Sequence, residues 1–262
     1  MNTPASHRVI RGLRRGLGRK LAYNYVSGAQ EVELVTDGLV VHLSADNIEG
    51  VADGGDVEVW ADQSVEGNHL DGPVVVNFPT FETNEVNSLP VVRFTFLEAD
   101  GLKGSSPLAG FATATGCTIV CVMKFRAISE PTNMMVNLDD GGTGTRLTMG
   151  PTGPALASRV DMAAGVTEAT AQIEPPDTNF HLWFGDFDEG NDTARLSLDG
   201  GAFVEAVEDP SNLTVGILSV GNSTGEDSSA MDIAEILVYN KRHDAAEIAQ
   251  IKAYLNNKYN LY

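Results

Sequence analysis

The sequence is short of bases, cysteines and long apolar runs. Its 262 residues include 17 Lys and Arg against 36 Asp and Glu, a formal net charge of −19, and two cysteines. Cys117 and Cys121 lie four residues apart in a predicted strand, which places their Cα atoms about 13 Å apart, too far for a disulfide. No apolar run approaches the roughly 20 residues of a membrane-spanning helix. We therefore expect two buried thiols and no membrane span.

What the sequence does have is an ordinary globular composition with an uneven charge. Apolar residues make up 42% and charged residues 20% of the chain, which is close to the average of globular proteins, so the chain can bury a core. Residues 1–30 hold six bases and no acid, which leaves 11 bases and 36 acids for the rest. The chain thus divides into an arm of charge +6 and a body of charge −25.

The arm, with its linker, is predicted to cover residues 1–36. Apolar residues recur in it at helical spacing with arginines beside them, which predicts an amphipathic segment. Gly12, Gly16 and Gly18 each cost up to about 1 kcal/mol in a helix, so we expect the arm to order only on contact with a partner. The residues predicted to make that contact are Arg8, Ile10, Arg11, Leu13, Arg14, Arg15, Leu17, Arg19, Lys20 and Leu21.

The partner of the arm stays open at the level of sequence. Six positive charges suit nucleic-acid phosphates, an anionic membrane or an acidic protein surface, which includes the acidic body of the chain itself. A body of charge −25 is repelled by nucleic acid. We therefore favour docking on a protein.

From Leu39 onward, short apolar runs alternate with turn residues. Residues 118–125, 181–185 and 233–239 are among the clearest strand patterns. Many short strands with regular turn signals are typical of an antiparallel sandwich. Only the end predicts a helix, over residues 244–259, because Asp244 and Glu247 form a capping-box pattern before apolar residues at helical spacing.

Five blocks of this pattern occur in the order and spacing of a known fold. They are residues 38–46, 60–70, 89–94, 181–200 and 232–259. Together they resemble the laminin-G-like, concanavalin-A-like jelly-roll domain of lectins and glucanases, which is also found in phage structural and surface proteins. The resemblance covers residues 37–262 as one domain. It implies an all-β antiparallel jelly roll of two curved sheets, a short C-terminal helix, and a binding or scaffold role rather than catalysis.

Catalytic patterns are weak in this sequence. Glycoside hydrolysis needs two carboxylates on one strand face, and the E-x-D-x-x-E run of the family's hydrolases is absent. Asp186 and Asp188 have a suitable spacing, but the resemblance places them at a hairpin tip. Asp232 and Glu235 have an odd spacing and are expected to face opposite ways. Residues 221–225 match G-x-S-x-G, but a strand follows where that motif needs a helix. We expect no enzyme.

Calcium is the one metal that the resemblance implies, at the rim of the sandwich. Its weak candidates are the acidic residues Asp139, Asp140, Asp186 and Asp188, and the alternative is that they lie in solvated acidic loops. The five histidines show no paired spacing for zinc, and no other cofactor is expected.

Four aromatic residues lie within the blocks of the resemblance. Trp60, Phe94, Trp183 and Tyr239 could stack on sugars, but their positions favour the core.

Two functions follow from these observations. The first is a structural virion protein, of the capsid-decoration or tail-fibre type, present in multiple copies and anchored to another virion protein by its basic arm. The alternative is a lectin-like module, extracellular or at a cell surface, that binds glycans and depends on calcium.

Overall fold

A computed structural model gives the fold of the chain. The chain divides into two units, Met1–Glu31 and Val32–Tyr262. The description below concerns the second unit. The residues that the structure describes are 32–73, 77–95, 100–111, 116–126, 136–139, 147–149, 160–164, 169–174, 176–188, 190–191, 193–207, 216–221 and 230–262.

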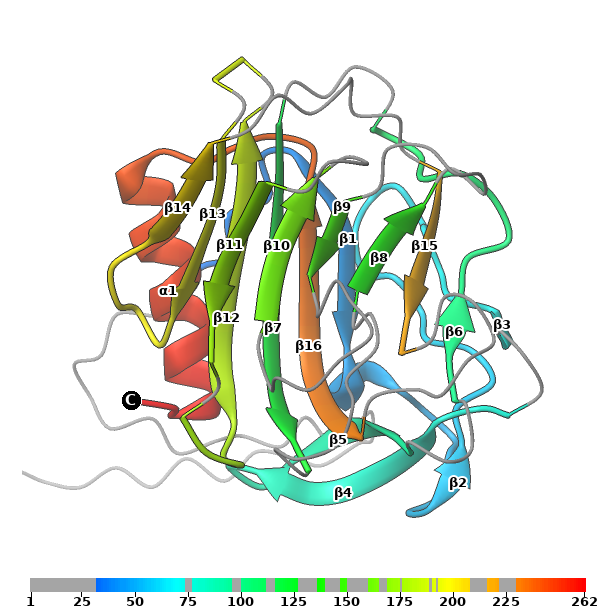
Figure 1. The fold of residues 1–262 in the computed structure, drawn as a ribbon. Coiled ribbons are helices and arrows are strands. Elements are labelled where there is room, and N and C mark those ends of the chain that lie inside the picture. The colour runs from blue at the N-terminus through cyan, green and yellow to red at the C-terminus, as the bar shows by residue number, and fades with distance from the viewer. Residues whose placement is uncertain are drawn as a thin grey trace, which may run out of the picture. The chain divides into compact units, whose positions relative to one another are not determined.

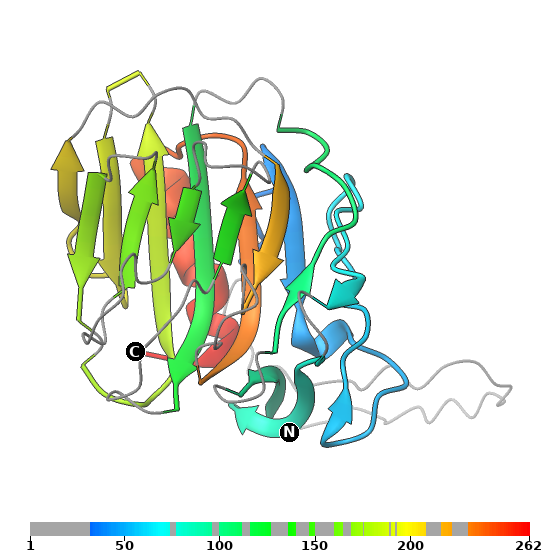
Figure 2. The same ribbon diagram turned by 45° about the vertical axis from the view of Figure 1, so that its right-hand side comes forward.

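Two antiparallel sheets lie face to face in this unit (Figures 1 and 2). The larger has the order β14-β13-β12-β7-β16-β5-β4-β2, and β1 also pairs with β16. Its strands are β1 (Leu39–Ser44), β2 (Gly55–Asp56), β4 (Thr80–Val86), β5 (Leu89–Phe94), β7 (Gly116–Phe125), β12 (His181–Asp188), β13 (Thr193–Leu198), β14 (Val204–Val207) and β16 (Met231–Tyr239).

The smaller sheet has the order β11-β10-β9-β8-β15-β6-β3. Its strands are β3 (Gly72–Pro73), β6 (Leu102–Lys103), β8 (Val136–Asp139), β9 (Leu147–Met149), β10 (Val160–Ala164), β11 (Ala169–Ile173) and β15 (Ile217–Val220). A short 3-10 helix, η1 (Ala45–Asn47), follows β1. The predicted all-β antiparallel sandwich is confirmed.

Strand β7 shows how the sequence fills both faces of the larger sheet. Successive side chains of a strand point to opposite faces. Ile119 and Cys121 pack between the two sheets, whereas Val120 and Val122 pack on the outer face. Cys121 and its neighbour Cys117 are buried free thiols, as predicted. Since both faces of β7 are buried, its sequence is almost continuously apolar rather than alternating.

The four aromatic residues that the sequence assigned to the core are buried. Trp60, Phe94 and Trp183 lie in the cluster between the sheets, and all three are 0% exposed. Tyr239 is also 0% exposed, but it packs on the outer face of the larger sheet. None of the four is placed to stack on a sugar, so the prediction of core positions is confirmed.

Helix α1 (Ala245–Tyr259) covers that outer face (Figure 1). It begins with the predicted capping box, in which the Asp244 side chain accepts hydrogen bonds from backbone N–H groups and Glu247 bonds back to the Asp244 N–H. The apolar stripe of the helix is buried against strand residues such as Val120, Leu182 and Phe184, and it consists of Ile248, Ile251, Leu255 and Tyr259. In the described part of the chain, no helix is long and apolar enough to cross a membrane.

A β-bulge in β16 corrects one prediction from the sequence. Ile233 pairs with Met123 and Glu235 pairs with Val122, so Ala234 is an extra residue in the ladder. An extra residue shifts the alternation of side chains by one. Asp232 and Glu235 were expected to face opposite ways, but both lie on the outer face, where they contact Lys124 and α1 respectively.

A second correction concerns Asp186. The resemblance implies a hairpin tip for this residue, but β12 continues to Asp188, and Asp186 is a fully buried strand residue paired with Arg195 of β13. The hairpin therefore turns after the two aspartates rather than at them.

The G-x-S-x-G match begins where β15 ends. Gly221 has φ +92°, and a Cβ there would overlap the Phe94 ring, so close packing requires this glycine. The rest of the match, residues 222–225, lies outside the described residues.

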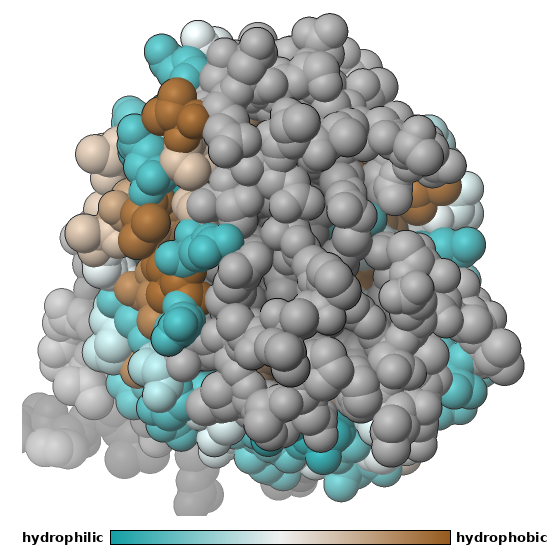
Figure 3. Space-filling view, in the orientation of Figure 1, coloured by the Kyte–Doolittle hydropathy of each residue, from teal (hydrophilic) through white to brown (hydrophobic). Residues whose placement is uncertain are grey.

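Strand β14 forms an edge of the larger sheet. Val204 and Val207 are 44% and 65% exposed there, on the side of the molecule where Figure 3 shows apolar atoms at the surface.

Candidate functional site

The predicted site residues are only partly within the described chain. The arm residues from Arg8 to Leu21 lie outside it, as does Asp140. Asp139 ends β8 in the smaller sheet. Asp186 and Asp188 lie together on one face of β12 in the larger sheet, so the structure does not bring Asp139 to them.

Arginines bind the two aspartates of β12. Arg195 donates from Nε and Nη2 to the two oxygens of Asp186 at 2.9 and 2.6 Å, and Arg242 Nε lies 3.3 Å from Asp186 Oδ1. Arg242 Nη1 also donates to Asp188 Oδ2 at 2.8 Å. Burial raises the pKa of Asp188, but hydrogen bonds from Asn191 and Arg242 outweigh it, and the net shift is downward. Two positive side chains occupy the space that a cation would need.

Metal-binding geometry is also missing elsewhere in the part of the chain that the structure describes. There, no three His, Cys, Asp or Glu side chains converge to hold an ion.

The carboxylates of β16 are equally engaged. Glu235 is 1% exposed and accepts hydrogen bonds from Lys258 Nζ at 2.6 Å and the Tyr259 hydroxyl at 2.7 Å, and it lies 2.9 Å from His42 Nε2. Burial raises the pKa of Glu235, but His42 and Lys258 outweigh it and hold the pKa below its usual value. A glycosidase acid needs a raised pKa. Glu235 is therefore not suited to donate a proton to a sugar.

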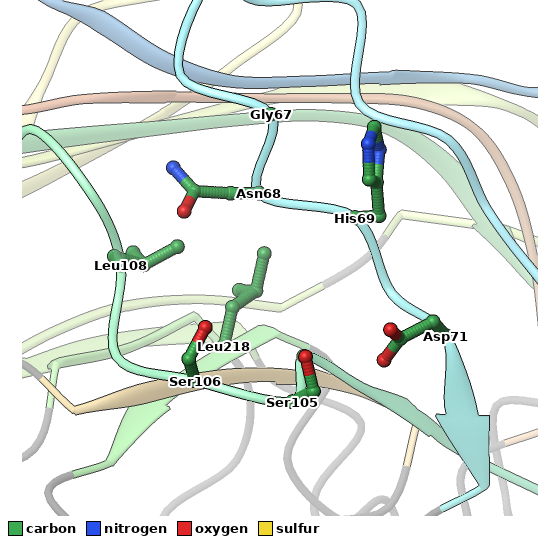
Figure 4. A pocket seen from close by; sticks show the side chains of 9 residues that line it. Gly67, Asn68, His69, Asp71, Ser105, Ser106, Leu108 and Leu218 are labelled. Carbon is green, nitrogen blue, oxygen red and sulfur yellow. The ribbon is translucent and has the colours of Figure 1, made fainter.

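A small polar pocket lies between two loops at the edge of the smaller sheet (Figure 4). Its volume is about 60 Å³. One loop connects Trp60 to β3, and the other follows β6. The described residues that line it are Gly67, Asn68, His69, Asp71, Gly104, Ser105, Ser106, Leu108 and Leu218.

The first loop is fixed by a buried carboxylate. Asp62 is 7% exposed and accepts four hydrogen bonds, from the backbone N–H groups of His42, Ser64 and Asn68 and from the Ser64 hydroxyl, at 2.6 to 2.9 Å. A carboxylate that accepts several N–H bonds holds its surroundings rigidly. The Asp-Gln-Ser and Gly-Asn-His segments of the sequence thus serve to shape this loop.

Asn68 joins the first loop to the second. Its amide donates to Val40 O at 2.7 Å and Ala109 O at 3.2 Å, and it accepts from Ala109 N at 2.9 Å. Backbone bonds from Gly104 N to Leu218 O and from Leu108 N to Gly216 O hold the second loop against β15. Both walls of the pocket are therefore built before any ligand arrives.

His69 stands at the rim. Its Nδ1 accepts a hydrogen bond from Asp62 N at 2.9 Å, so the neutral ring carries its proton on Nε2. In Figure 4 the ring points away from the two serines. His69 therefore helps to fix the loop and borders the pocket without entering it.

Three polar side chains of the pocket have no internal partner. Among the described residues, none forms a hydrogen bond or an ion pair with the Asp71 carboxylate or with the Ser105 and Ser106 hydroxyls. Figure 4 shows them directed toward the space between the loops, into which the buried side chain of Leu218 also projects. The pocket thus presents one charged acceptor and two hydroxyls that can donate or accept.

Sequence reasoning missed these residues. Residues 60–70 carry part of the resemblance to the jelly-roll fold, but no motif in the sequence groups Asp71, Ser105 and Ser106. They meet because β3 and β6 pair, with Gly72 opposite Lys103, and two-residue strands leave little signal in a sequence.

Comparisons with known proteins identify similar folds, but they assign the chain to no family. No protein-family model matches the sequence, and no curated protein matches it. Solved structures do match. Domain 4 of AbnA, a GH43 extracellular arabinanase from Geobacillus stearothermophilus solved with arabinotriose, has a TM-score of 0.58 at 10% identity, over 83% of this chain and 100% of that one.

Two further structures align over about half of their own length. Botulinum neurotoxin type C, whose cell entry depends on interaction with two ganglioside molecules, has a TM-score of 0.56 at 9% identity, over 83% of this chain and 51% of that one. An arabinofuranosidase complexed with arabinofuranosyl-alpha-1,2-xylobiose has a TM-score of 0.55 at 13% identity, over 76% of this chain and 50% of that one.

The comparisons support the lectin-like side of the predicted resemblance and give no support to its phage side. At 9% to 13% identity, these likenesses show the fold alone, namely that the chain shares the β-sandwich fold of these domains.

Proposed function

We propose that this protein is a non-catalytic module that binds glycans outside the cell. The observation that carries the proposal is the pocket of Figure 4, where a rigid frame holds Asp71, Ser105 and Ser106 without internal partners. The fold lends support, because the arabinanase domain solved with arabinotriose aligns over its whole length.

The chemistry of the pocket suits sugar hydroxyls. Each hydroxyl of a sugar both donates and accepts, so a carboxylate can accept from two neighbouring hydroxyls while serine hydroxyls complete the pattern. A volume of about 60 Å³ is far below the range of drug-sized ligand pockets. Only one edge of a sugar ring enters such a space. We therefore expect weak binding of a terminal or protruding sugar residue.

The pocket is not equipped for hydrolysis. Glycoside hydrolysis uses two carboxyl groups about the scissile bond. Among the described residues that line this pocket, Asp71 is the one carboxylate. Binding without bond cleavage is the function that this geometry supports.

A glycan array probed with the full-length protein, with calcium and with a chelator, tests the proposal. We expect binding to a restricted set of sugars. Asp71→Asn removes a charged acceptor and should weaken binding at least about tenfold by calorimetry, and Ser106→Ala should weaken it less. Glu174→Gln, at an exposed position outside the pocket, is the control of equal charge change.

Two results would count against the proposal. A blank array under both conditions removes glycan binding altogether. If Asp71→Asn and Ser106→Ala both leave glycan binding unchanged, the glycan binds somewhere other than this pocket. Calcium dependence stays a prediction, and the chelator arm of the array decides it.

The structural role in a virion also stays a prediction. Its anchor, from Arg8 to Leu21, lies outside the described residues, and none of the structures compared above is a virion protein.

A further inference from the structure

A second surface feature is formed by the segment that follows β1, from Asn47 to Ala61. It is an open groove of about 660 Å³ formed by one continuous segment. It shares no lining residue with the pocket of Figure 4. We call it the 47–61 groove, and its lining residues are Asn47, Ile48, Glu49, Gly50, Val51, Ala52, Asp56, Glu58, Val59 and Ala61.

The groove has an apolar floor. Ile48 and Val51 are half-buried and pack against the cluster between the sheets. Val59 is 52% exposed, one of the few large apolar side chains of the described residues that face solvent. Single exposed apolar residues are ordinary, but here Val59 adjoins two others in one concave surface.

The rim of the groove is acidic and unpaired. Glu49, Asp56 and Glu58 are exposed, and among the described residues none of their carboxylates has a hydrogen bond or an ion pair. No Lys, Arg or His is among the lining residues. The outer face of the larger sheet is different, because Asp186 and Asp232 both hold arginines there.

The backbone of the groove is held in place without a ligand. Gly54 N donates to Phe81 O at 2.7 Å, and Val57 N donates to Pro79 O at 2.8 Å, which ties the segment to β4. Asp53 accepts from the N–H and the hydroxyl of Thr83, both at 2.8 Å. Asp53 therefore helps to fix the segment, and the carboxylates available to a partner are those of Glu49, Asp56 and Glu58. A fixed backbone lowers the entropy cost of binding.

We propose that the 47–61 groove docks a basic amphipathic segment of a partner protein. An apolar floor with acidic sides is complementary to a segment that carries apolar residues on one face and Lys or Arg beside them. A metal ion fits less well, since no three acidic or histidine side chains converge within the described residues. A sugar also fits less well, because the floor between these carboxylates presents valine and isoleucine side chains, which cannot bond to sugar hydroxyls.

A synthetic peptide of leucine and lysine at helical spacing tests the proposal on the full-length protein by calorimetry. We expect binding that weakens with salt. The double variant Glu49→Gln/Glu58→Gln should lower the affinity about tenfold, because it removes two charge pairs. Val59→Ser should lower it about fivefold through lost apolar contact, with the salt dependence unchanged.

Matched controls separate this groove from the general acidity of the body. Glu174→Gln/Glu205→Gln makes the same charge change at exposed positions outside the groove and should leave the affinity within twofold of the parent. The proposal is overturned if that control loses as much affinity as Glu49→Gln/Glu58→Gln. It is also overturned if the peptide does not bind, or if a peptide with glutamine in place of leucine binds as tightly.

Discussion

The larger sheet buries both of its faces, but in two different ways. The face toward the smaller sheet forms what we call the inner core, which consists of apolar side chains such as Trp60, Trp183 and Ile119. The face under α1 forms the outer cluster, where Tyr259 and Phe184 pack beside carboxylates that are 0 to 1% exposed. Those carboxylates are Asp186, Asp232 and Glu235, and each holds a cationic partner.

This difference between the two faces suggests different roles for them, one in the stability of the fold and the other in the position of α1. Apolar burial contributes free energy in proportion to area and is not directional. A buried ion pair contributes less net stability, since desolvation offsets much of the attraction, but it is demanding in geometry. Near the end of α1, Lys258 and Tyr259 both bond to Glu235. We therefore expect the inner core to set the free energy of unfolding and the outer cluster to set where α1 lies.

The largest effect is expected in the inner core. Trp183 is fully buried and meets Phe125 edge-on at a centroid distance of 6.4 Å. Trp183→Ala should lower the free energy of unfolding by about 3–5 kcal/mol, because it removes a large apolar side chain and leaves a cavity. Denaturant unfolding measures the loss. Val204→Ala, at a position 44% exposed, is the control and should change stability by less than about 0.5 kcal/mol. A loss at Trp183 no larger than at Val204 would contradict the role of the inner core.

The next effect is expected at Glu235. Glu235→Gln leaves Lys258 and His42 beside a neutral amide, and breaking a buried pair in this way costs about 3–5 kcal/mol when both partners are desolvated. Here the Lys258 and His42 side chains are 19% and 13% exposed, so water offsets part of the cost. We expect a loss of about 2 kcal/mol by denaturant unfolding.

Lys258→Met is the paired variant for Glu235. It leaves Glu235 with His42 and Tyr259 as partners, so it should cost less than Glu235→Gln does. An equal or larger loss for Lys258→Met would show that the lysine, rather than the carboxylate, organises this contact.

Acid should act on the outer cluster first. Hydrogen bonding to Lys241, opposed by burial, and a further bond involving His243 lower the pKa of Glu247 from 4.5 to about 2. The pKa of Glu235 is also lowered from 4.5. A carboxyl group whose folded pKa is depressed stabilises the fold fully above its unfolded pKa and loses that contribution as pH falls through the folded value.

The loss at Glu235 begins as pH falls below 4.5, and the window for Glu247 runs from pH 4.5 down to about pH 2. We expect the denaturation midpoint to fall within it. The share due to Glu235 is bounded by the roughly 2 kcal/mol of Glu235→Gln, so that variant should lose less stability on acidification than the parent. An identical pH profile in the variant would exclude Glu235 as a source of the pH dependence.

The two thiols of the inner core do not change their charge in acid. Burial raises the pKa values of Cys117 and Cys121, so both stay neutral thiols through this range.

Much of the fold could be predicted from the sequence because the patterns that specify it lie within a few neighbouring residues. The capping residues Asp244 and Glu247 and the apolar stripe after them specify α1 over three to four turns. The turn at Asp199 and Gly200, which have φ +46° and +73°, is marked by residues that tolerate this conformation.

The misplaced residues are those whose positions depend on distant partners. Alternation predicts opposite faces for Asp232 and Glu235, and one extra residue at Ala234 reverses this without any mark in the sequence. Aspartate is disfavoured in strands, yet Arg195 and Arg242 make Asp186 acceptable there. The pocket was missed for the same reason, since Asp71 and Ser105 meet only through pairing of β3 with β6.

The smallest effect is expected at Lys252, in the middle of α1. Its Nζ bonds to Ser197 Oγ at 2.9 Å and lies 4.8 Å from the centroid of Phe203 and 5.4 Å from that of Phe184. Burial lowers the pKa of Lys252, more strongly than Asp186 raises it, so the charge is poorly compensated where it lies. Its long apolar stem already packs as a methionine would.

Lys252→Met exchanges a cation–π contact and a hydrogen bond for relief from desolvation, terms that are each about 1 kcal/mol. We expect the free energy of unfolding to change by less than about 0.5 kcal/mol. Comparing the free energy of unfolding of this variant with that of Lys258→Met, in the same denaturant, distinguishes the two lysines of the outer cluster. A lysine paired with a buried carboxylate should be costly to remove, and one that only lies over aromatic rings should not, so equal losses at the two positions would mean that carboxylate pairing does not set the stability of this face.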